Sequence, residues 1–178
     1  MTSITEDALL DGRVRLLQPA EGYRVAIDPV ILAAAVSAAP GERVLDLGTG
    51  TGAAALCLAV REPGCRVTGL ERELTLVRLA QSSAELTGVA GRVDFMMGDL
   101  LAPPPRLAPA SFHHVMANPP YLPAGGTISP ESGRALAHGA GECKAARPKR
   151  RGGESTQGAV AFIASAAVRT YVLGALTP

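Results

Sequence analysis

Short apolar runs alternate with longer stretches of helical apolar spacing through the first two thirds of the chain. Helical spacing occurs at residues 53–60 and 74–86, and the second stretch ends at Gly88, a residue typical of helix C-termini. The resulting β-α-β-α-β order predicts a parallel sheet with right-handed crossovers. Four runs have the length of buried strands: residues 44–47, 66–70, 92–96 and 112–117.

A further strand and a further helix are predicted ahead of this unit. Residues 14–17 form a strand-like run, which we expect to pair with residues 23–25 as half of a small hairpin. Asp28 followed by Pro29 predicts a helix start, with Asp as the N-cap and Pro at the first helical position. This helix is expected to reach about Ala38, before Pro40-Gly41.

Composition narrows the class of protein without naming a partner. The chain has 178 residues, one domain's worth, and is 47% hydrophobic but 3% aromatic, so Ala, Leu and Val must form the core. The net charge of +1 argues neither for nor against nucleic acid. The three cysteines form no C-x-x-C pair, which predicts reduced thiols and no metal site. The chain has no long apolar run, so we expect a soluble cytoplasmic protein that does not bind membranes.

A glycine-rich turn links the first predicted strand to its helix. Gly48, Gly50 and Gly52 allow the backbone to turn tightly and approach a ligand, and free N–H groups of the helix start face the same place. Such a turn suits the polar or anionic part of a nucleotide-like molecule. Gly48, Gly50 and Ala53 also fit the G-x-G-x-x-G/A pattern, which keeps a nicotinamide enzyme open as an alternative.

Two carboxylates follow the next two strands. Glu71 lies about twenty residues beyond the glycine turn, where a carboxylate can accept hydrogen bonds from both hydroxyls of a ribose. Asp99 has the same position after the third strand, where it can accept from an adenine amino group. Because ligands of open α/β sheets bind at the carboxyl ends of the strands, these groups are expected to converge on one site.

The fourth strand leads into Asn118-Pro119-Pro120-Tyr121, the most specific motif in the chain. The two prolines remove two backbone donors and hold an extended chain, which leaves carbonyl oxygens and the Asn118 amide oxygen free to accept. Acceptors of this kind can hold the N–H bonds of a planar amino group and favour its pyramidal, nucleophilic form. Tyr121 offers a ring on which a planar substrate can stack.

Together these features resemble the class I S-adenosylmethionine-dependent methyltransferases that methylate amino groups. Upstream segments resemble more narrowly the bacterial tRNA (adenine-N6) methyltransferases acting on a valine tRNA; they are Gln18-Pro19, Gly22-Tyr23-Arg24 and residues 28–33. The resemblance covers residues 9–138. It implies a Rossmann-like α/β fold, with a mostly parallel sheet and helices on both faces. The motifs that carry it are residues 45–52, Glu71, Asp99 and residues 118–121.

The resemblance also implies a role for each site residue. The glycine turn would hold the methionine part of S-adenosylmethionine, Glu71 the ribose and Asp99 the adenine, with residues 23–28 over the cofactor. The implied activity is methylation of the exocyclic amino group of an adenine in tRNA. The implied cofactor-binding residues are Asp46, Gly48, Thr49, Gly50, Gly52, Glu71, Asp99, Tyr23, Arg24 and Asp28, and the implied catalytic residues are Asn118, Pro119 and Tyr121.

The family pattern weakens after residue 140. Relatives have seven strands, whereas four are found here, so we expect a methyltransferase domain at 1–140, with hairpin and helix at 9–40 and the site at 41–125. Residues 141–178 are read as an atypical basic and apolar tail. Its cluster at 144–151 is expected to be a solvated linker, and residues 159–176 are apolar enough to cover part of an exposed fourth strand.

Two further alternatives to tRNA methylation stay open. One is methylation of a glutamine side chain in a protein, because the tetrapeptide at 118–121 suits any planar amide or amine. The other is a truncated, non-catalytic protein that retains the cofactor site. The sequence does not define the oligomeric state.

Overall fold

The computed structural model describes residues 3–22, 24–100, 102, 104–107, 111–118 and 160–162, the last three by their backbone only. Within these residues a two-stranded hairpin and a five-stranded sheet are joined by three helices. The elements are β1 (Ile4–Leu9), β2 (Val14–Pro19), α1 (Asp28–Ala35), β3 (Arg43–Leu47), α2 (Ala53–Arg61), β4 (Arg66–Glu71), α3 (Leu74–Thr87), β5 (Val93–Met97), β6 (His114–Ala117) and β7 (Val160–Phe162).

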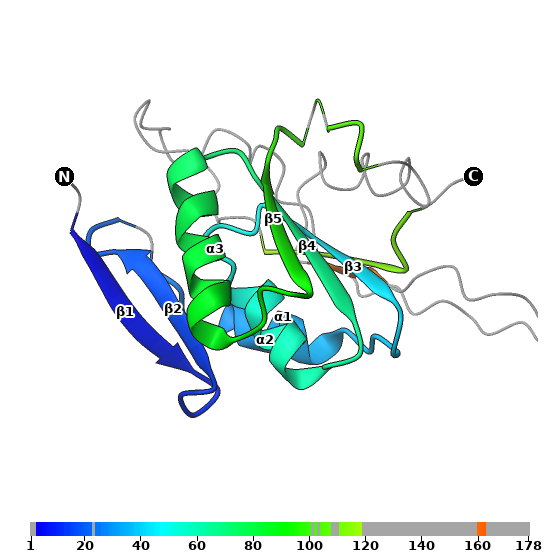
Figure 1. The fold of residues 1–178 in the computed structure, drawn as a ribbon, viewed down its shortest axis with the longest axis horizontal. Coiled ribbons are helices and arrows are strands. Elements are labelled where there is room, and N and C mark those ends of the chain that lie inside the picture. Colours follow the sequence, from blue (N-terminus) through cyan, green and yellow to red (C-terminus); the bar gives the residue numbers. More distant parts are fainter. Residues whose placement is uncertain are drawn as a thin grey trace, which may run out of the picture.

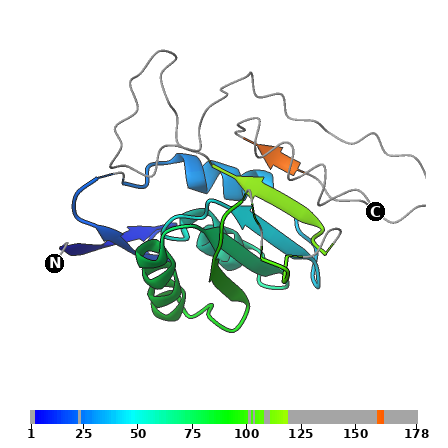
Figure 2. The ribbon, with the colours of Figure 1, turned by 90° about the horizontal axis from the view of Figure 1, so that it is seen from above.

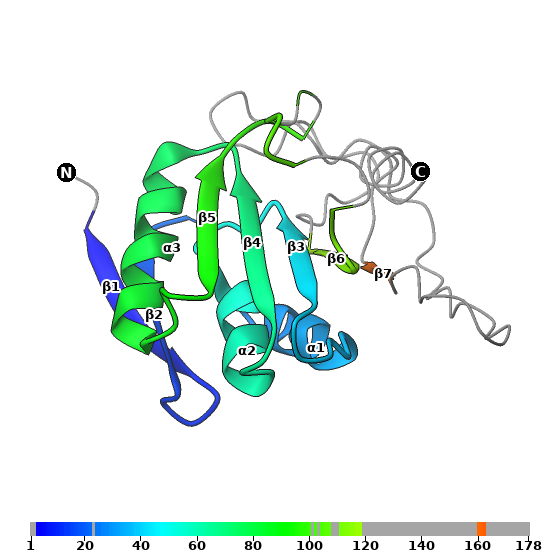
Figure 3. The same ribbon diagram turned by 45° about the vertical axis from the view of Figure 1, so that its right-hand side comes forward.

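The larger sheet is parallel throughout, and its strands lie in the order β5-β4-β3-β6-β7 (Figure 3). The four strands predicted from apolar runs and the Rossmann-like arrangement are therefore confirmed. From β3 the chain moves outward to β4 and β5, and then returns to the other side of β3 as β6. The strand order thus reverses between β3 and β6, which is where open α/β sheets bind their ligands.

The short strand β7 pairs with the outer edge of β6. Val115, Met116 and Ala117 are in register with Val160, Ala161 and Phe162. Part of the tail therefore pairs with β6, the fourth predicted strand, whose outer edge was expected to be exposed. The basic cluster at 144–151 lies outside the described residues.

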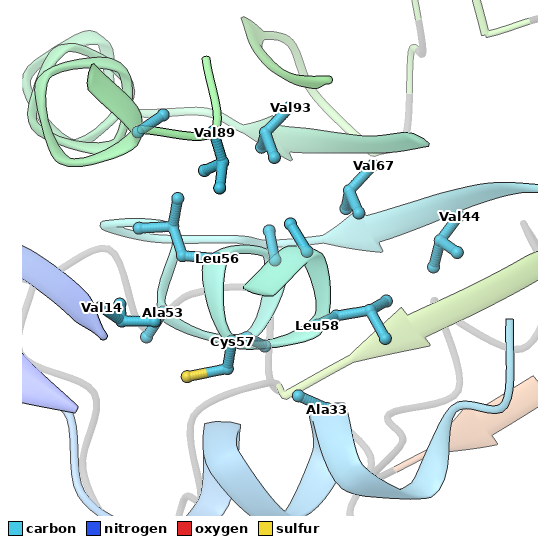
Figure 4. Packing of buried hydrophobic residues seen from close by; sticks show 14 of the residues in the cluster. Val14, Ala33, Val44, Ala53, Leu56, Cys57, Leu58, Val67, Val89 and Val93 are labelled. Carbon is cyan, nitrogen blue, oxygen red and sulfur yellow. The ribbon is translucent and has the colours of Figure 1, made fainter. Parts of the chain in front are cut away.

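All three described helices lie on one face of the sheet, with the hairpin beyond them (Figures 1 and 2). Side chains alternate along the strands, so that Val44, Val67 and Met116 join residues of α1, α2 and α3 in one apolar cluster. Figure 4 shows part of this cluster, including Val44 and Val67. The opposite face forms a separate, smaller cluster, which includes Leu45 and Leu107. The prediction of helices on both faces is thus met on one face within the described residues.

The predicted partner of β2 was wrong. β2 pairs antiparallel with β1, from Ile4 opposite Pro19 to Leu9 opposite Val14, and not with residues 23–25. Its other edge is also occupied, because hydroxyl groups of α3 bind its backbone. Ser83 Oγ accepts from Leu17 N–H at 2.9 Å, while Thr87 Oγ1 accepts from Arg15 N–H at 3.1 Å. With both edges bonded, β2 has no room for a further strand.

Helix α1 differs from prediction at both ends. Ile27 is the N-cap and makes no side-chain capping bond; Asp28 lies inside the first turn, where its charge suits the helix dipole. The helix ends at Ala35 rather than near Ala38. Arg61 at the end of α2 donates to Ala33 O at 2.7 Å, and so satisfies a carbonyl in the last turn of α1.

Candidate functional site

The turn between β3 and α2 has the left-handed backbone that its glycines predict. Gly48, Gly50 and Gly52 have φ angles of +67°, +59° and +87°, values that residues with a side chain adopt only at a cost. The N–H groups of Gly48 and Thr49 both donate to Leu70 O, at 2.9 and 3.0 Å. The turn is therefore fixed to the end of the neighbouring strand β4.

A phenylalanine ring supports this turn, and the sequence reading missed it. A Cβ added at Gly52 would lie 2.6 Å from Phe95 Cζ, and one added at Gly69 would lie 2.5 Å from Phe95 Cδ1. Phe95 thus packs between the start of α2 and the middle of β4, in space that only glycines leave open. An isolated glycine inside a strand signals such a close approach, and Gly69 carried that signal.

Glu71 ends β4 as predicted, and its carboxylate lies against the glycine turn. Its Oε2 accepts from Gly50 N–H at 3.0 Å, while Oε1 accepts from the N–H groups of Arg72 and Glu73, at 2.7 and 3.0 Å. These three amides hold the carboxylate in one orientation at the carboxyl edge of the sheet. The structure therefore brings together two groups that lie about twenty residues apart in the chain.

Asp46 and Thr49 lie beneath the turn rather than on its surface. Thr49 Oγ1 donates to Asp46 Oδ2 at 2.6 Å, and both residues are buried. Burial raises the pKa of the Asp46 carboxyl to about 7, with a smaller contribution from the charge of Glu71 and opposed by hydrogen bonds from Thr49 and Ala55. The pair braces the turn, and a direct part in cofactor binding stays a prediction.

The raised pKa of Asp46 predicts a pH-dependent stability. Because the folded protein keeps a proton that the unfolded chain releases above pH 3.8, the free energy of unfolding should fall as pH rises from 3.8 to about 7. Asp46→Asn, which keeps an acceptor for Thr49, should lack this dependence. Urea denaturation across this range should show the wild type losing roughly 2 kcal/mol relative to the variant, less than the ideal value because buried sites relax. Parallel stability curves would contradict this assignment.

The end of β5 reaches the same edge. Gly98 N–H donates to Glu71 O at 2.9 Å, and Asp99 follows directly, forming a short antiparallel bridge with Ala102. Asp99 therefore lies beside the strand end that carries Glu71. Its predicted contact with an adenine amino group stays a prediction.

Asn118 follows β6 on the other side of the glycine turn. Since Ala117 is in register with Leu47, Asn118 lies level with Gly48, at the point where the strand order reverses. Its amide oxygen Oδ1 is buried and has no hydrogen-bond partner among the described residues. A buried acceptor left unpaired costs free energy, which is consistent with a donor supplied by a ligand. Pro119 and Tyr121 lie outside the described residues.

The predicted residues before α1 are only partly described. Tyr23 lies outside the described residues. The guanidinium of Arg24 faces the hairpin, where it pairs with Asp7 Oδ2 at 2.6 Å and donates to Thr5 Oγ1 at 2.8 Å. Asp28 begins α1. Cofactor contacts of Arg24 and Asp28 therefore stay predictions.

The described residues offer neither a metal-binding cluster nor a membrane-spanning helix. They contain no group of three or more His, Cys, Asp and Glu side chains placed to hold a metal ion. None of their helices has the length and apolar character needed to cross a membrane. Cys57 and Cys65 are buried free thiols, and burial raises the pKa of Cys57 to about 11, which keeps it protonated.

The fold and the site define an open α/β domain with a nucleotide-type site at its topological switch point. Residues 25–145 match the methyltransferase small domain, and the chain belongs to this family. The resemblance drawn from the sequence motifs is confirmed at this level.

Curated relatives include methyltransferases of two substrate types. The tRNA1(Val) (adenine(37)-N6)-methyltransferase of Vibrio campbellii is 34% identical over 116 residues, which cover 65% of this chain and 47% of the relative. The release factor glutamine methyltransferase of Chlorobaculum tepidum is 34% identical over 94 residues, covering 52% of this chain and 32% of the relative. The chain thus spans half or less of the length of these relatives.

Solved structures agree on the fold. The protein YjhP of Escherichia coli matches with a TM-score of 0.52 and 19% identity, over 87% of this chain and 46% of that one. At this identity the match shows the shared fold alone.

Proposed function

We propose that this chain is an S-adenosylmethionine-dependent N-methyltransferase that methylates the exocyclic amino group of an adenine in tRNA. The observation that carries the proposal is Oδ1 of Asn118, a buried acceptor that has no partner among the described residues and lies level with the glycine turn at the switch point. An acceptor there suits an N–H donor of the substrate. We assign the activity to residues 1–140, with 141–178 as a tail, and a tRNA substrate implies a cytoplasmic location.

The residues at the carboxyl edge of the sheet fit the cofactor. A carboxylate offers about four acceptor directions, so Glu71, which holds three amides, can still accept from a ribose hydroxyl. The amides of the glycine turn and the start of α2 suit the carboxylate of the methionine part. Because Glu71 is held in place before any ligand binds, little ordering is required on binding.

The proposed chemistry needs positioning more than a reactive side chain. S-adenosylmethionine supplies a methyl group from a positively charged sulfonium, so that an N–CH3 bond forms as the S–CH3 bond breaks and the nitrogen then releases a proton to water. Asn118 Oδ1 would accept an N–H bond of the substrate and favour a nucleophilic nitrogen. Holding the two reactants in line can supply roughly 7–11 kcal/mol of the barrier.

Adenine in tRNA is favoured over a protein glutamine by the longer of the two alignments, 116 residues against 94. The glutamine methyltransferases remain the second candidate, since an amide nitrogen and an adenine amino group have the same planar geometry. Tritium transfer from labelled S-adenosylmethionine to bulk tRNA or to purified release factors would separate these two candidates. Cofactor binding with neither transfer would favour a non-catalytic protein.

Cofactor binding is tested by calorimetric titration of the full chain with S-adenosylmethionine. Glu71→Ala should weaken binding about 10–100-fold, because charged hydrogen bonds to the ribose are lost. Glu73→Ala is the matched control, because it removes the same charge two residues away. The Glu73 side chain is exposed, and the variant keeps the backbone N–H that donates to Glu71.

Two results would contradict the cofactor assignment. One is a folded wild-type protein that does not bind S-adenosylmethionine. The other is binding of a nicotinamide dinucleotide in its place, which would restore the nicotinamide enzyme as an alternative.

A further inference from the structure

A buried glutamine joins the hairpin to the segment that leads into α1. Gln18 is 3% exposed, and both ends of its amide are bonded. Its Oε1 accepts from Val25 N–H at 2.8 Å, and its Nε2 donates to Asp7 Oδ2 at 3.0 Å. Asp7 Oδ2 also accepts from Arg24 at 2.6 Å. Residues 24 and 25 are therefore tied to both strands of the hairpin.

The contacts of β2 with α3 show which end of the domain this bridge occupies. Arg15 bonds to Thr87 in the last turn of α3, and Leu17 bonds to Ser83 one turn earlier. β2 thus runs along α3 toward its start, and α3 starts just after Glu71. Gln18 therefore lies toward the carboxyl edge of the sheet.

The contacts of α1 with α2 place the next segment at the same end. Arg61, the last residue of α2, donates to Ala33 O near the end of α1, so the two helices end together. They have 8 and 9 residues and pack in the same cluster, so they also begin at the same end of the domain. α2 begins at the glycine turn. Residues 24–27, which precede α1, thus cross the domain on the side of that turn.

We infer that Gln18 is a positioning residue, which holds residues 24–27 at the cofactor edge through its bond to Val25. This inference rests on the proposed function for the identity of the ligand. The segment presents Ile27, which is 62% exposed, next to the cofactor edge. Asp7 supports this positioning, because its carboxylate orients both the Gln18 amide and the Arg24 guanidinium. The hairpin is thus a brace for the cofactor site as well as part of the core.

A core role alone and a positioning role predict different results for Gln18→Met, which keeps the volume but loses both hydrogen bonds. Positioning predicts faster hydrogen exchange at the Val25 amide, with no change in α3 or β4, and S-adenosylmethionine binding weakened about tenfold. The methyl-transfer KM for the cofactor should rise by the same factor while kcat changes little.

Two further variants sharpen this test. In Gln18→Glu/Asp7→Asn, the new carboxylate at position 18 can accept from Val25 N–H and from the new amide at position 7, whereas Gln18→Glu alone places two carboxylates together. The new amide no longer accepts from Arg24 at the shared position of Oδ2, so cofactor affinity should recover in part relative to Gln18→Glu alone. Glu6→Gln is the matched control, because it breaks an exposed ion pair with Arg15 on the same hairpin. It should change neither the exchange at Val25 nor the affinity.

The exchange measurement needs no ligand, so it separates this inference from the proposed function. A Gln18→Met protein whose Val25 exchange or cofactor affinity equals that of the wild type would overturn the positioning role. If Gln18→Met does not fold, the comparison of Gln18→Glu with the double variant decides, and absence of recovery would count against the inference. A wild type that protects Val25 but binds no S-adenosylmethionine would overturn the cofactor assignment, and with it the ligand named here.

Discussion

Replacing Asn118 by alanine should lower the rate of methyl transfer about 10²–10³-fold while leaving the affinity for S-adenosylmethionine nearly unchanged. The loss is expected because we propose that the buried Oδ1 of Asn118 accepts from the substrate amino group, whereas the proposed cofactor residues lie on β3, β4 and their turns. Single-turnover transfer to unmodified tRNA, with cofactor affinity measured by calorimetry, tests both halves of this prediction.

The same substitution should not destabilise the fold. Removing a buried acceptor that has no partner among the described residues relieves a desolvation cost, so the melting temperature without ligands should stay level or rise. Asn118→Asp is the informative companion variant, because it keeps an acceptor oxygen in a side chain of nearly the same shape. An Asn118→Ala protein that transfers methyl groups at the wild-type rate would remove Asn118 from the mechanism.

Local patterns were enough to predict the sheet and the places where its strands end. Strands β3 to β6 each follow from one apolar run, and the glycine turn and Glu71 are fixed by their neighbours in sequence. Because the strands are parallel and in register, the residues at their carboxyl ends lie at one edge of the sheet. Knowing where each strand ends is therefore enough to place these residues together.

Contacts between distant segments could not be predicted in the same way. The pairing of β1 with β2 was missed because ITEDAL has no alternation of apolar and polar residues. Glu6 and Asp7 stand side by side in a strand of which no residue is fully buried. The bridge from Gln18 to Val25 and Asp7 depends on where the hairpin packs, which no local spacing encodes. The predicted N-cap of α1, Asp28, was wrong because Ile27 already has helical backbone angles. Ile27 is therefore the N-cap, and Asp28 lies in the first turn.

Substituting Gly52 by alanine should destabilise the protein by about 3 kcal/mol or more, since two separate costs add. A φ of +87° is unfavourable by roughly 1–2 kcal/mol for a residue with a side chain. The new Cβ would also lie 2.6 Å from Phe95 Cζ and 3.2 Å from Ala80 Cβ, and overpacking of this kind costs about 1–3 kcal/mol. Urea denaturation of both proteins measures the difference in the free energy of unfolding.

Gly88→Ala separates the two costs. Gly88 has a similar φ of +76° at the end of α3, but a Cβ there would meet nothing within 4 Å, so only the backbone cost of about 1 kcal/mol is expected. In a Phe95→Leu background, Gly52→Ala should lower the free energy of unfolding by less than it does in the wild type. Gly88→Ala should lower it by the same amount in both backgrounds, because only the Cβ at position 52 meets the ring. Equal losses in the two alanine variants would mean that Phe95 does not fill the space beneath the turn, and that the turn depends on its backbone conformation alone.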